Sequence, residues 1–182
     1  MEHYIKQSER EFSQRKLEEY DKFGRIIRWG RQNPVLFAEH FFGVKLFDYQ
    51  KWCFAESWAR PFVLWLECRA AGKTAKLAVF LMAKMLLIPS YTVFISTLTA
   101  EQSVRTFRKL EDIALQRIPS FRSCTDIFAR EVDKSQNSDT GFLHNPMGHT
   151  FRLFNNSELR TLSSNLNALR GNRGSVAYDE AA

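Results

Sequence analysis

Two apolar segments, each followed by a segment of helical character, constrain the fold of this chain most. Residues 62–66 form a continuous apolar run after a proline, and residues 91–96 form a second, largely apolar run. Runs of this length are typical of strands that are buried on both faces of a parallel sheet. Helices are expected over residues 74–87 and 99–118, directly after the two runs. This alternation predicts an α/β fold with a mostly parallel sheet, right-handed crossovers and flanking helices.

The segment before the first apolar run is predicted to be helical. Residues 4–31 are highly charged, and their apolar residues recur at helical spacing, which indicates one or two amphipathic helices that dock on the core. Short helices are expected over residues 34–41, after an Asn-Pro pair, and over residues 49–59. We therefore predict an N-terminal helical extension over residues 1–45 and a core domain over residues 46–182.

Charge and cysteine content narrow the class of protein. The net charge of +6 favours a polyanionic partner, nucleic acid first. Three widely spaced cysteines form neither a disulfide framework nor a zinc site and indicate a reducing compartment. The N-terminus has no apolar signal sequence, and the longest apolar run, residues 77–88, contains Lys84 and is too short to span a bilayer. These features predict a cytoplasmic protein without a membrane partner.

The turn between the first apolar run and the next helix, residues 67–74, is a candidate phosphate-binding loop. Backbone N–H groups at a helix N-terminus attract an anion, and Gly72 allows the chain to approach phosphates closely. Lys73 would neutralise the β- and γ-phosphates of ATP, and the Thr74 hydroxyl would hold Mg²⁺. Glu67 occupies the position of the first glycine in the usual motif. The alternative interpretation is a polar turn with Lys73 in solvent.

Asp179 and Glu180 directly follow a short apolar strand, expected over residues 176–178. An ATPase needs one carboxylate at a strand end to hold Mg²⁺ and a second to orient and deprotonate the attacking water. Successive residues at a strand tip point in different directions, so the pair meets both needs. The alternative is an exposed acidic turn. Further strands are expected over residues 150–154 and 159–162.

These segments together resemble a known family, the large terminase subunits of tailed bacteriophages. Residues 68–74 resemble that family's phosphate loop, which commonly lacks the first glycine and carries an arginine at the position of Arg69. Residues 168–182 are similar to its Arg-Gly segment and Asp-Glu-Ala box. Tyr49 and Gln50 resemble the glutamine motif that recognises adenine, and residues 94–97 resemble its second conserved strand. The matches occur in the same order over residues 46–182.

The resemblance implies a P-loop NTPase-type core that couples hydrolysis of ATP with Mg²⁺ to translocation of double-stranded DNA into a procapsid. Implied partners are double-stranded DNA, a small terminase subunit and a portal protein, with a homo-oligomeric ring, in the cytoplasm of an infected bacterial host. The expected catalytic residues are Glu180, Lys73 and Arg69. The expected nucleotide-binding residues are Gln50, Arg69, Ala70, Ala71, Gly72, Lys73 and Thr74. The expected Mg²⁺ ligands are Thr74 and Asp179.

The arginines permit two interpretations each. Arg69 would stabilise charge that develops on the γ-phosphate, or it would pair with Glu67 or a nearby carboxylate and only brace the loop. Arg160, Arg170 and Arg173 lie in a segment with a single acidic residue, and one of them could reach a neighbouring subunit's nucleotide while others contact DNA phosphates. The alternative for these three is a solvated basic face.

Two other functions remain open. One is a helicase-like, nucleic-acid-dependent ATPase, which would share the glutamine motif, the loop and the acidic pair. The other is a non-hydrolysing nucleotide-binding or assembly fragment. A complete terminase is expected to continue with a coupling motif and a nuclease domain after the acidic box. We therefore expect this chain to be an N-terminal fragment whose fold is incomplete at the C-terminus.

Overall fold

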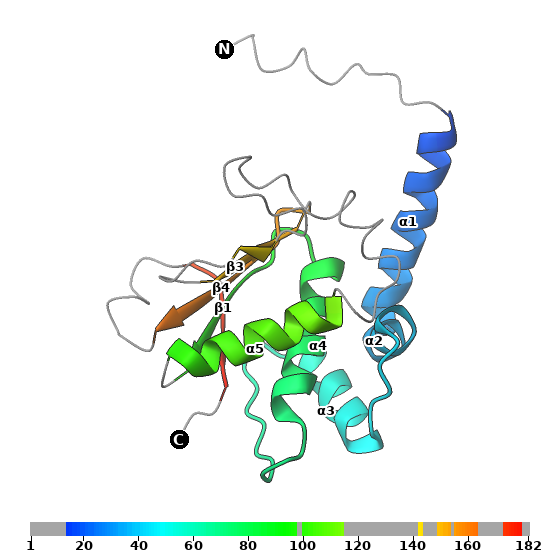
Figure 1. The fold of residues 1–182 in the computed structure, drawn as a ribbon. Coiled ribbons are helices and arrows are strands. Elements are labelled where there is room, and N and C mark those ends of the chain that lie inside the picture. Colours follow the sequence, from blue (N-terminus) through cyan, green and yellow to red (C-terminus); the bar gives the residue numbers. More distant parts are fainter. Residues whose placement is uncertain are drawn as a thin grey trace.

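A computed structural model describes residues 14–97, 100–114, 142–143, 149–153, 155–163 and 173–179. Within these ranges, helices cover one face of a sheet, and α1 projects away from the remainder (Figure 1). The helices are α1 (Gln14–Gln32), α2 (Pro34–Phe42), α3 (Asp48–Trp58), α4 (Lys73–Leu87) and α5 (Ala100–Asp112). The strands are β1 (Thr92–Thr97), β2 (Phe142–Leu143), β3 (Thr150–Arg152), β4 (Glu158–Ser163) and β5 (Ser175–Tyr178).

The sheet has the strand order β2-β3-β4-β1-β5. Strand β1 pairs in parallel with β4 on one side and with β5 on the other. The short β3 is antiparallel to both β2 and β4, so every described strand except β3 runs in the same direction. The predicted α/β fold with a mostly parallel sheet is therefore confirmed. Because β1 and β5 are parallel neighbours, their carboxyl ends, at Thr97 and Tyr178, lie at the same edge of the sheet.

The hydrophobic core lies between the sheet and the helices. Val93 and Ile95 of β1 and Leu159 of β4 belong to the same buried cluster as the apolar side of α4. Helix α5 packs on β1 and β4, and α4 packs between α5 and the first three helices. The aromatic residues Phe37 and Phe42 bring α2 into this core as well. Burial on this side explains why α4 is apolar along most of its length.

The first helices follow the predicted pattern. Residues 14–32 form a single helix rather than two, and residues 1–13 lie outside the described part. Helix α2 begins at Pro34 and ends before Gly43, which adopts the left-handed conformation that terminates helices (φ 61°).

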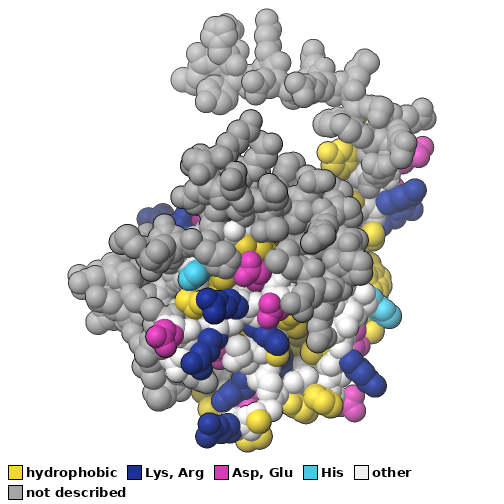
Figure 2. All heavy atoms as spheres, viewed as in Figure 1, with side chains coloured by type: hydrophobic (Ala, Val, Ile, Leu, Met, Phe, Trp, Pro, Cys, Tyr) yellow, Lys and Arg dark blue, Asp and Glu magenta, His cyan; other side chains and the backbone are white. Residues whose placement is uncertain are grey.

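Positive and negative side chains are interspersed over the lower part of the face shown in Figure 2. Among the described helices, none has both the length and the apolar character needed to cross a lipid bilayer.

The prediction of a buried strand over residues 62–66 is wrong. This segment is extended but is not part of the sheet, and in the described part of the chain no strand pairs with it. Phe62, Leu64 and Leu66 are 91%, 77% and 85% exposed. A run of apolar residues indicates hydrophobic character, but a parallel strand also needs neighbouring strands on its edges. The other sequence-based elements agree with the structure to within a few residues wherever they lie in described ranges.

Two glycines of α1 test how closely this helix packs. A Cβ atom on Gly30 would lie 2.7 Å from Leu87 Cδ2 and 2.8 Å from Phe37 Cδ2, whereas one on Gly24 would meet nothing within 4 Å. We expect Gly30→Ala to lower the free energy of unfolding by about 1–3 kcal/mol through overpacking. We expect Gly24→Ala to raise it by roughly 0.5–1 kcal/mol, because alanine is the better helix former. Urea denaturation measures both, and equal effects would contradict the packing of α1 on α4.

Candidate functional site

The candidate phosphate-binding loop has an unusual backbone. Ala70 and Gly72 both have positive φ angles, 66° and 79°. At Gly72 a side chain would be strained, and its Cβ would lie 3.1 Å from Gln50 Nε2. Ala70 adopts the left-handed conformation despite its side chain, at a cost of about 1–2 kcal/mol. The loop therefore has a specific shape that ends at the N-terminus of α4, where the first backbone N–H groups lack helical partners.

Helix α3 holds the loop from one side. Tyr49 donates a hydrogen bond from its hydroxyl to the Ala71 carbonyl (2.7 Å), and Gln50 Nε2 donates to the same carbonyl (3.2 Å). The other end of the amide, Gln50 Oε1, accepts from the Phe47 backbone N–H (3.1 Å). Gln50 is buried, with 7% of its surface exposed. In this structure Gln50 supports the loop, and its role in adenine recognition stays a prediction.

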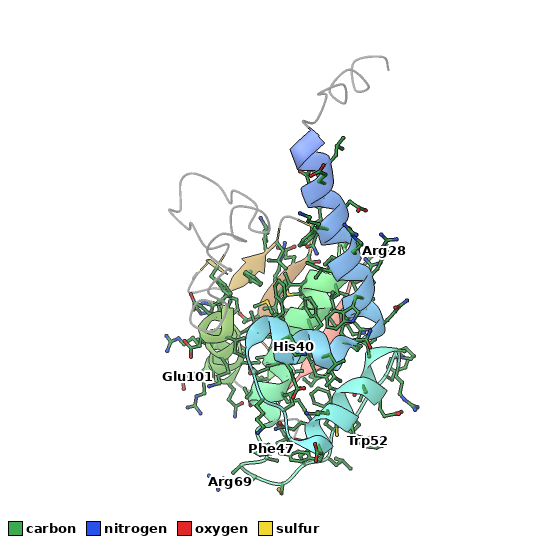
Figure 3. The ribbon with its side chains drawn as sticks, turned by 90° about the vertical axis from the view of Figure 1, so that its right-hand side faces the viewer. Arg28, His40, Phe47, Trp52, Arg69 and Glu101 are labelled. Carbon is green, nitrogen blue, oxygen red and sulfur yellow. The ribbon has the colours of Figure 1, made fainter. Side chains whose placement is uncertain are left out.

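The two cationic residues of the loop occupy different surroundings. Lys73 is the first residue of α4, and its Nζ donates to the Glu67 carbonyl (3.2 Å). Arg69 is exposed and points outward from the loop (Figure 3). A concavity of about 390 Å³ is lined by residues of the loop and by Tyr49: Tyr49, Glu67, Cys68, Arg69, Ala70 and Ala71. The suggested pairing of Arg69 with Glu67 is not observed, because the Glu67 carboxylate pairs with Lys76.

Asp179 connects three elements at the carboxyl edge of the sheet. Its Oδ2 atom accepts hydrogen bonds from Thr74 Oγ1 (3.0 Å) and from Thr106 Oγ1 (2.6 Å). Thr74 belongs to the first turn of α4, and Thr106 lies within α5. The Asp179 backbone N–H bonds to the Ser96 carbonyl (3.2 Å), which fixes the residue at the ends of β1 and β5. The side chains of Thr74 and Asp179, 105 residues apart in the sequence, are thus in direct contact.

The donor atoms at this point suit magnesium. A hydroxyl and a carboxylate are hard oxygen ligands, and Mg²⁺ in phosphate-binding enzymes usually takes one or two protein oxygens together with water and phosphate oxygens. Thr74 and Asp179 offer these oxygens side by side, 3.0 Å apart. Within the described residues there is no cluster of three or more His, Cys, Asp or Glu that could hold a metal without such help. The residues therefore fit the cation expected to accompany a triphosphate.

The remaining candidates lie either outside the described residues or away from this cluster. Glu180 and Arg170 lie outside the described residues. Arg160 lies in β4, where its Nε donates to Glu158 Oε1 (2.8 Å). Arg173 is exposed and precedes β5, so it lies at the opposite end of that strand from Asp179, roughly 20 Å away at about 3.3 Å per residue. The structure does not bring Arg160 or Arg173 to the loop, and their roles toward DNA or a neighbouring subunit stay predictions.

Sequence reasoning did not identify Thr106 or Lys76 as partners in this region, and it suggested Arg69 rather than Lys76 as the partner of Glu67. Thr106 is fully buried on the core side of α5. A threonine on the apolar stripe of a helix indicates a buried hydroxyl that needs a hydrogen-bond partner. Lys76 is a charged residue within the apolar helix α4, and this too was visible in the sequence. Their partners, however, are set by tertiary contacts: Thr106 and Asp179 are 73 residues apart, and Lys76 meets Glu67 across the loop.

Comparison with models of protein families gives no match for this chain, and comparison with curated proteins gives none either. Inferences about function therefore depend on the residues and contacts described above.

Thr106 provides a test of the contact with Asp179. We expect Thr106→Val to lower the free energy of unfolding by about 1.5–3 kcal/mol, because a buried carboxylate loses a hydroxyl donor. Thr106→Ser keeps the hydroxyl and loses one methyl group, so a loss of about 1 kcal/mol is expected. Chemical denaturation of both variants measures the difference. If the valine variant is as stable as the serine variant, the hydrogen bond does not contribute.

Glu158 is expected to make stability depend on pH. Burial raises the pKa of this carboxyl, but hydrogen bonds and charges from Arg160 and Arg152 outweigh burial and hold it below its usual value. A lowered folded-state pKa stabilises the fold above the unfolded value and ceases to do so as pH falls through the folded value. At pH 7, Glu158→Gln should lower the free energy of unfolding by roughly 1 kcal/mol. The effect is modest because both arginines are partly exposed, and solvent screens their charges.

The difference between this variant and the wild type should shrink as pH falls through the folded-state pKa of Glu158. Glu56→Gln is the matched control, because Glu56 pairs with Arg60 on an exposed helix surface. Its effect should be within about 0.5 kcal/mol at any pH. Urea denaturation at several pH values checks both variants. A loss at Glu158 that persists unchanged in acid would contradict this account.

Proposed function

We propose that this protein binds ATP with Mg²⁺ as the ATPase part of a P-loop motor of the terminase type. The observation that carries the proposal is the hydrogen bond between the Thr74 hydroxyl and the Asp179 carboxylate. Thr74 lies in the first turn of the helix after a candidate phosphate loop, and Asp179 directly follows a parallel strand next to β1. A P-loop NTPase needs this pair of oxygens at the place where its metal meets the phosphates.

The proposed binding mode follows from the surroundings of each residue. The free N–H groups at the start of α4 would contact the phosphates. Lys73 would leave the Glu67 carbonyl, which is a neutral partner, for the more strongly attracting phosphate oxygens. Bound Mg²⁺ would neutralise part of the triphosphate charge between Thr74 and Asp179. Arg69, exposed beside the concavity, is free to approach the γ-phosphate, and Glu180 is proposed as the base that activates water.

The wider assignment is supported by the arginine in the loop, the Arg-Gly segment before β5 and the positive net charge. We propose that the partner nucleic acid is double-stranded DNA, whose phosphates attract a basic protein without regard to sequence. A small terminase subunit, a portal protein and a ring of identical subunits complete the proposed motor. Host cytoplasm is the proposed location.

Titration calorimetry tests nucleotide binding. We expect Lys73→Ala and Asp179→Asn to weaken binding of ATP with Mg²⁺ to the full chain at least tenfold, about 1.4 kcal/mol, because each removes a charge next to the phosphates or metal. Lys109→Ala is the control, since Lys109 is an exposed residue of α5. It should bind as the wild type does. The proposal is wrong if all four proteins bind alike or if none binds.

Phosphate release then separates the three functions. Hydrolysis that is stimulated by double-stranded DNA and lost in Glu180→Gln supports the packaging motor. Stimulation by single strands instead supports the helicase-like alternative. Nucleotide binding without phosphate release supports a binding or assembly module.

A further inference from the structure

A buried ion pair lies behind the candidate loop. Lys76 Nζ contacts Glu67 Oε1, and the lysine side chain is fully buried while the glutamate side chain is 9% exposed. The ammonium also lies 4.0 Å from the centroid of the Trp65 ring. Glu67 is the first residue of the loop and Lys76 lies in the first turn of α4, so the pair joins the two ends of the loop.

The pair is costly to bury. Removal from water lowers the pKa of Lys76, an effect that neighbouring Cys53 opposes. The second oxygen of the carboxylate, Glu67 Oε2, is buried and has no hydrogen-bond partner among the described residues. Buried ion pairs often contribute no more stability than apolar residues of similar size. Stability alone therefore does not account for charges at these two positions.

The segment before the loop, residues 62–66, is attached mainly through Trp65, whose ring also packs on Phe80 of α4 with 5.6 Å between the centroids. Phe62, Leu64 and Leu66 are exposed, and no described strand pairs with this segment. Trp65 is its inward-facing residue, and its Nε1 donates to Ser57 Oγ on α3 (2.8 Å). The contacts of Trp65 and Glu67 with Lys76 therefore attach this flank of the loop to α4.

Glu67 also links the pair to the proposed phosphate ligand. Its carboxylate holds Lys76, and its carbonyl accepts the hydrogen bond from Lys73. A displacement of Glu67 would therefore move both the start of the loop and the resting position of Lys73. Glu67 occupies the position where the usual motif has a glycine.

We propose that Glu67 and Lys76 form an ion-pair clamp that sets the shape of the phosphate loop, so that both act as positioning residues for nucleotide binding. The inference rests on the proposed function, because it concerns the geometry of the same loop. Neither residue needs to touch the nucleotide. In the usual motif a glycine allows the backbone to adopt the loop conformation. Here the contact between Glu67 and Lys76 holds the backbone in its conformation instead.

Lys84 offers a matched control on the same helix. It lies eight residues after Lys76, is part-buried, and places its ammonium 4.6 Å from the centroid of the Trp58 ring. It donates to the Trp58 carbonyl, and burial lowers its pKa as it does for Lys76. Lys84 does not contact Glu67 or the loop in any interaction found for it. Loss of either lysine should thus reduce stability, but only loss of Lys76 should disturb the loop.

The first measurement is hydrogen–deuterium exchange of the full chain without nucleotide, followed in peptides that cover residues 67–76. Lys76→Met should increase exchange in this segment at least tenfold relative to its effect on β1, because the loop opens locally. Lys84→Met should change exchange in the loop no more than elsewhere. Equal loop exchange in the two variants would overturn the clamp.

The second measurement is calorimetric titration with ADP and Mg²⁺. Lys76→Met and Glu67→Gln should each raise Kd at least tenfold with unchanged stoichiometry, whereas irreversibly misfolded protein would lower the stoichiometry and leave Kd unchanged. Reversible unfolding would also raise the apparent Kd, so Lys84→Met is measured beside them as the control for lost stability. The double variant should be no weaker than either single variant, because both remove the same interaction. Additive losses in the double variant, or a Kd for Lys76→Met equal to that of Lys84→Met, would overturn the clamp.

Lys73→Ala separates failure of the clamp from failure of the proposed function. If Lys73→Ala binds ADP as tightly as the wild type, the loop is not a phosphate site and the proposed function fails, while exchange still decides whether the clamp shapes the loop. If Lys73→Ala weakens binding and Lys76→Met does not, the proposed function stands and the clamp is wrong.

Discussion

The hydrogen bond from Thr74 to Asp179 is the contact on which the candidate site depends. It joins the first turn of α4 to the end of β5, and Thr106 of α5 donates to the same carboxylate oxygen. A carboxylate that is 7% exposed needs such partners, because burying an unpaired charge is costly. The two hydroxyls satisfy Asp179 and at the same time hold two helices against the carboxyl edge of the sheet.

The conformation of the loop next to this contact depends on contacts with neighbouring elements. Ala70 is held in a left-handed conformation that alanine disfavours, so surrounding contacts must impose it. Tyr49 and Gln50 hold the Ala71 carbonyl from α3, and Glu67 is fastened to Lys76 of α4. Contacts with neighbouring elements thus fix the backbone conformation of this loop, which has a glycine at position 72. In glycine-rich loops the flexible backbone adopts the required conformation by itself.

Charge is distributed unequally between the two ends of the sheet. Lys73, Arg69 and Asp179 gather at the carboxyl edge, where parallel α/β sheets commonly bind ligands. Arg160 lies within β4, where it is engaged with Glu158, and Arg173 is exposed before β5, at the opposite end of that strand from Asp179. Any role of these two arginines toward DNA or a neighbouring subunit would therefore involve a surface separate from the loop, and it would leave the geometry of the loop unchanged.

The sequence by itself determined α4, β1 and β5, because apolar periodicity and turn residues are local properties. For the same reason it placed Thr74 at the start of a helix and Asp179 at the end of a strand. It indicated the hydrophobic character of residues 62–66 but not their exposure, since the neighbours of a strand are chosen by the whole sheet. Only the tertiary structure decided that Glu67 pairs with Lys76 rather than Arg69, that Gln50 is buried, and that Thr106 reaches Asp179. Thr106 and Asp179 are 73 residues apart, and Glu67 and Lys76 are separated by the loop between them. No local pattern encodes which of these residues will be adjacent after folding.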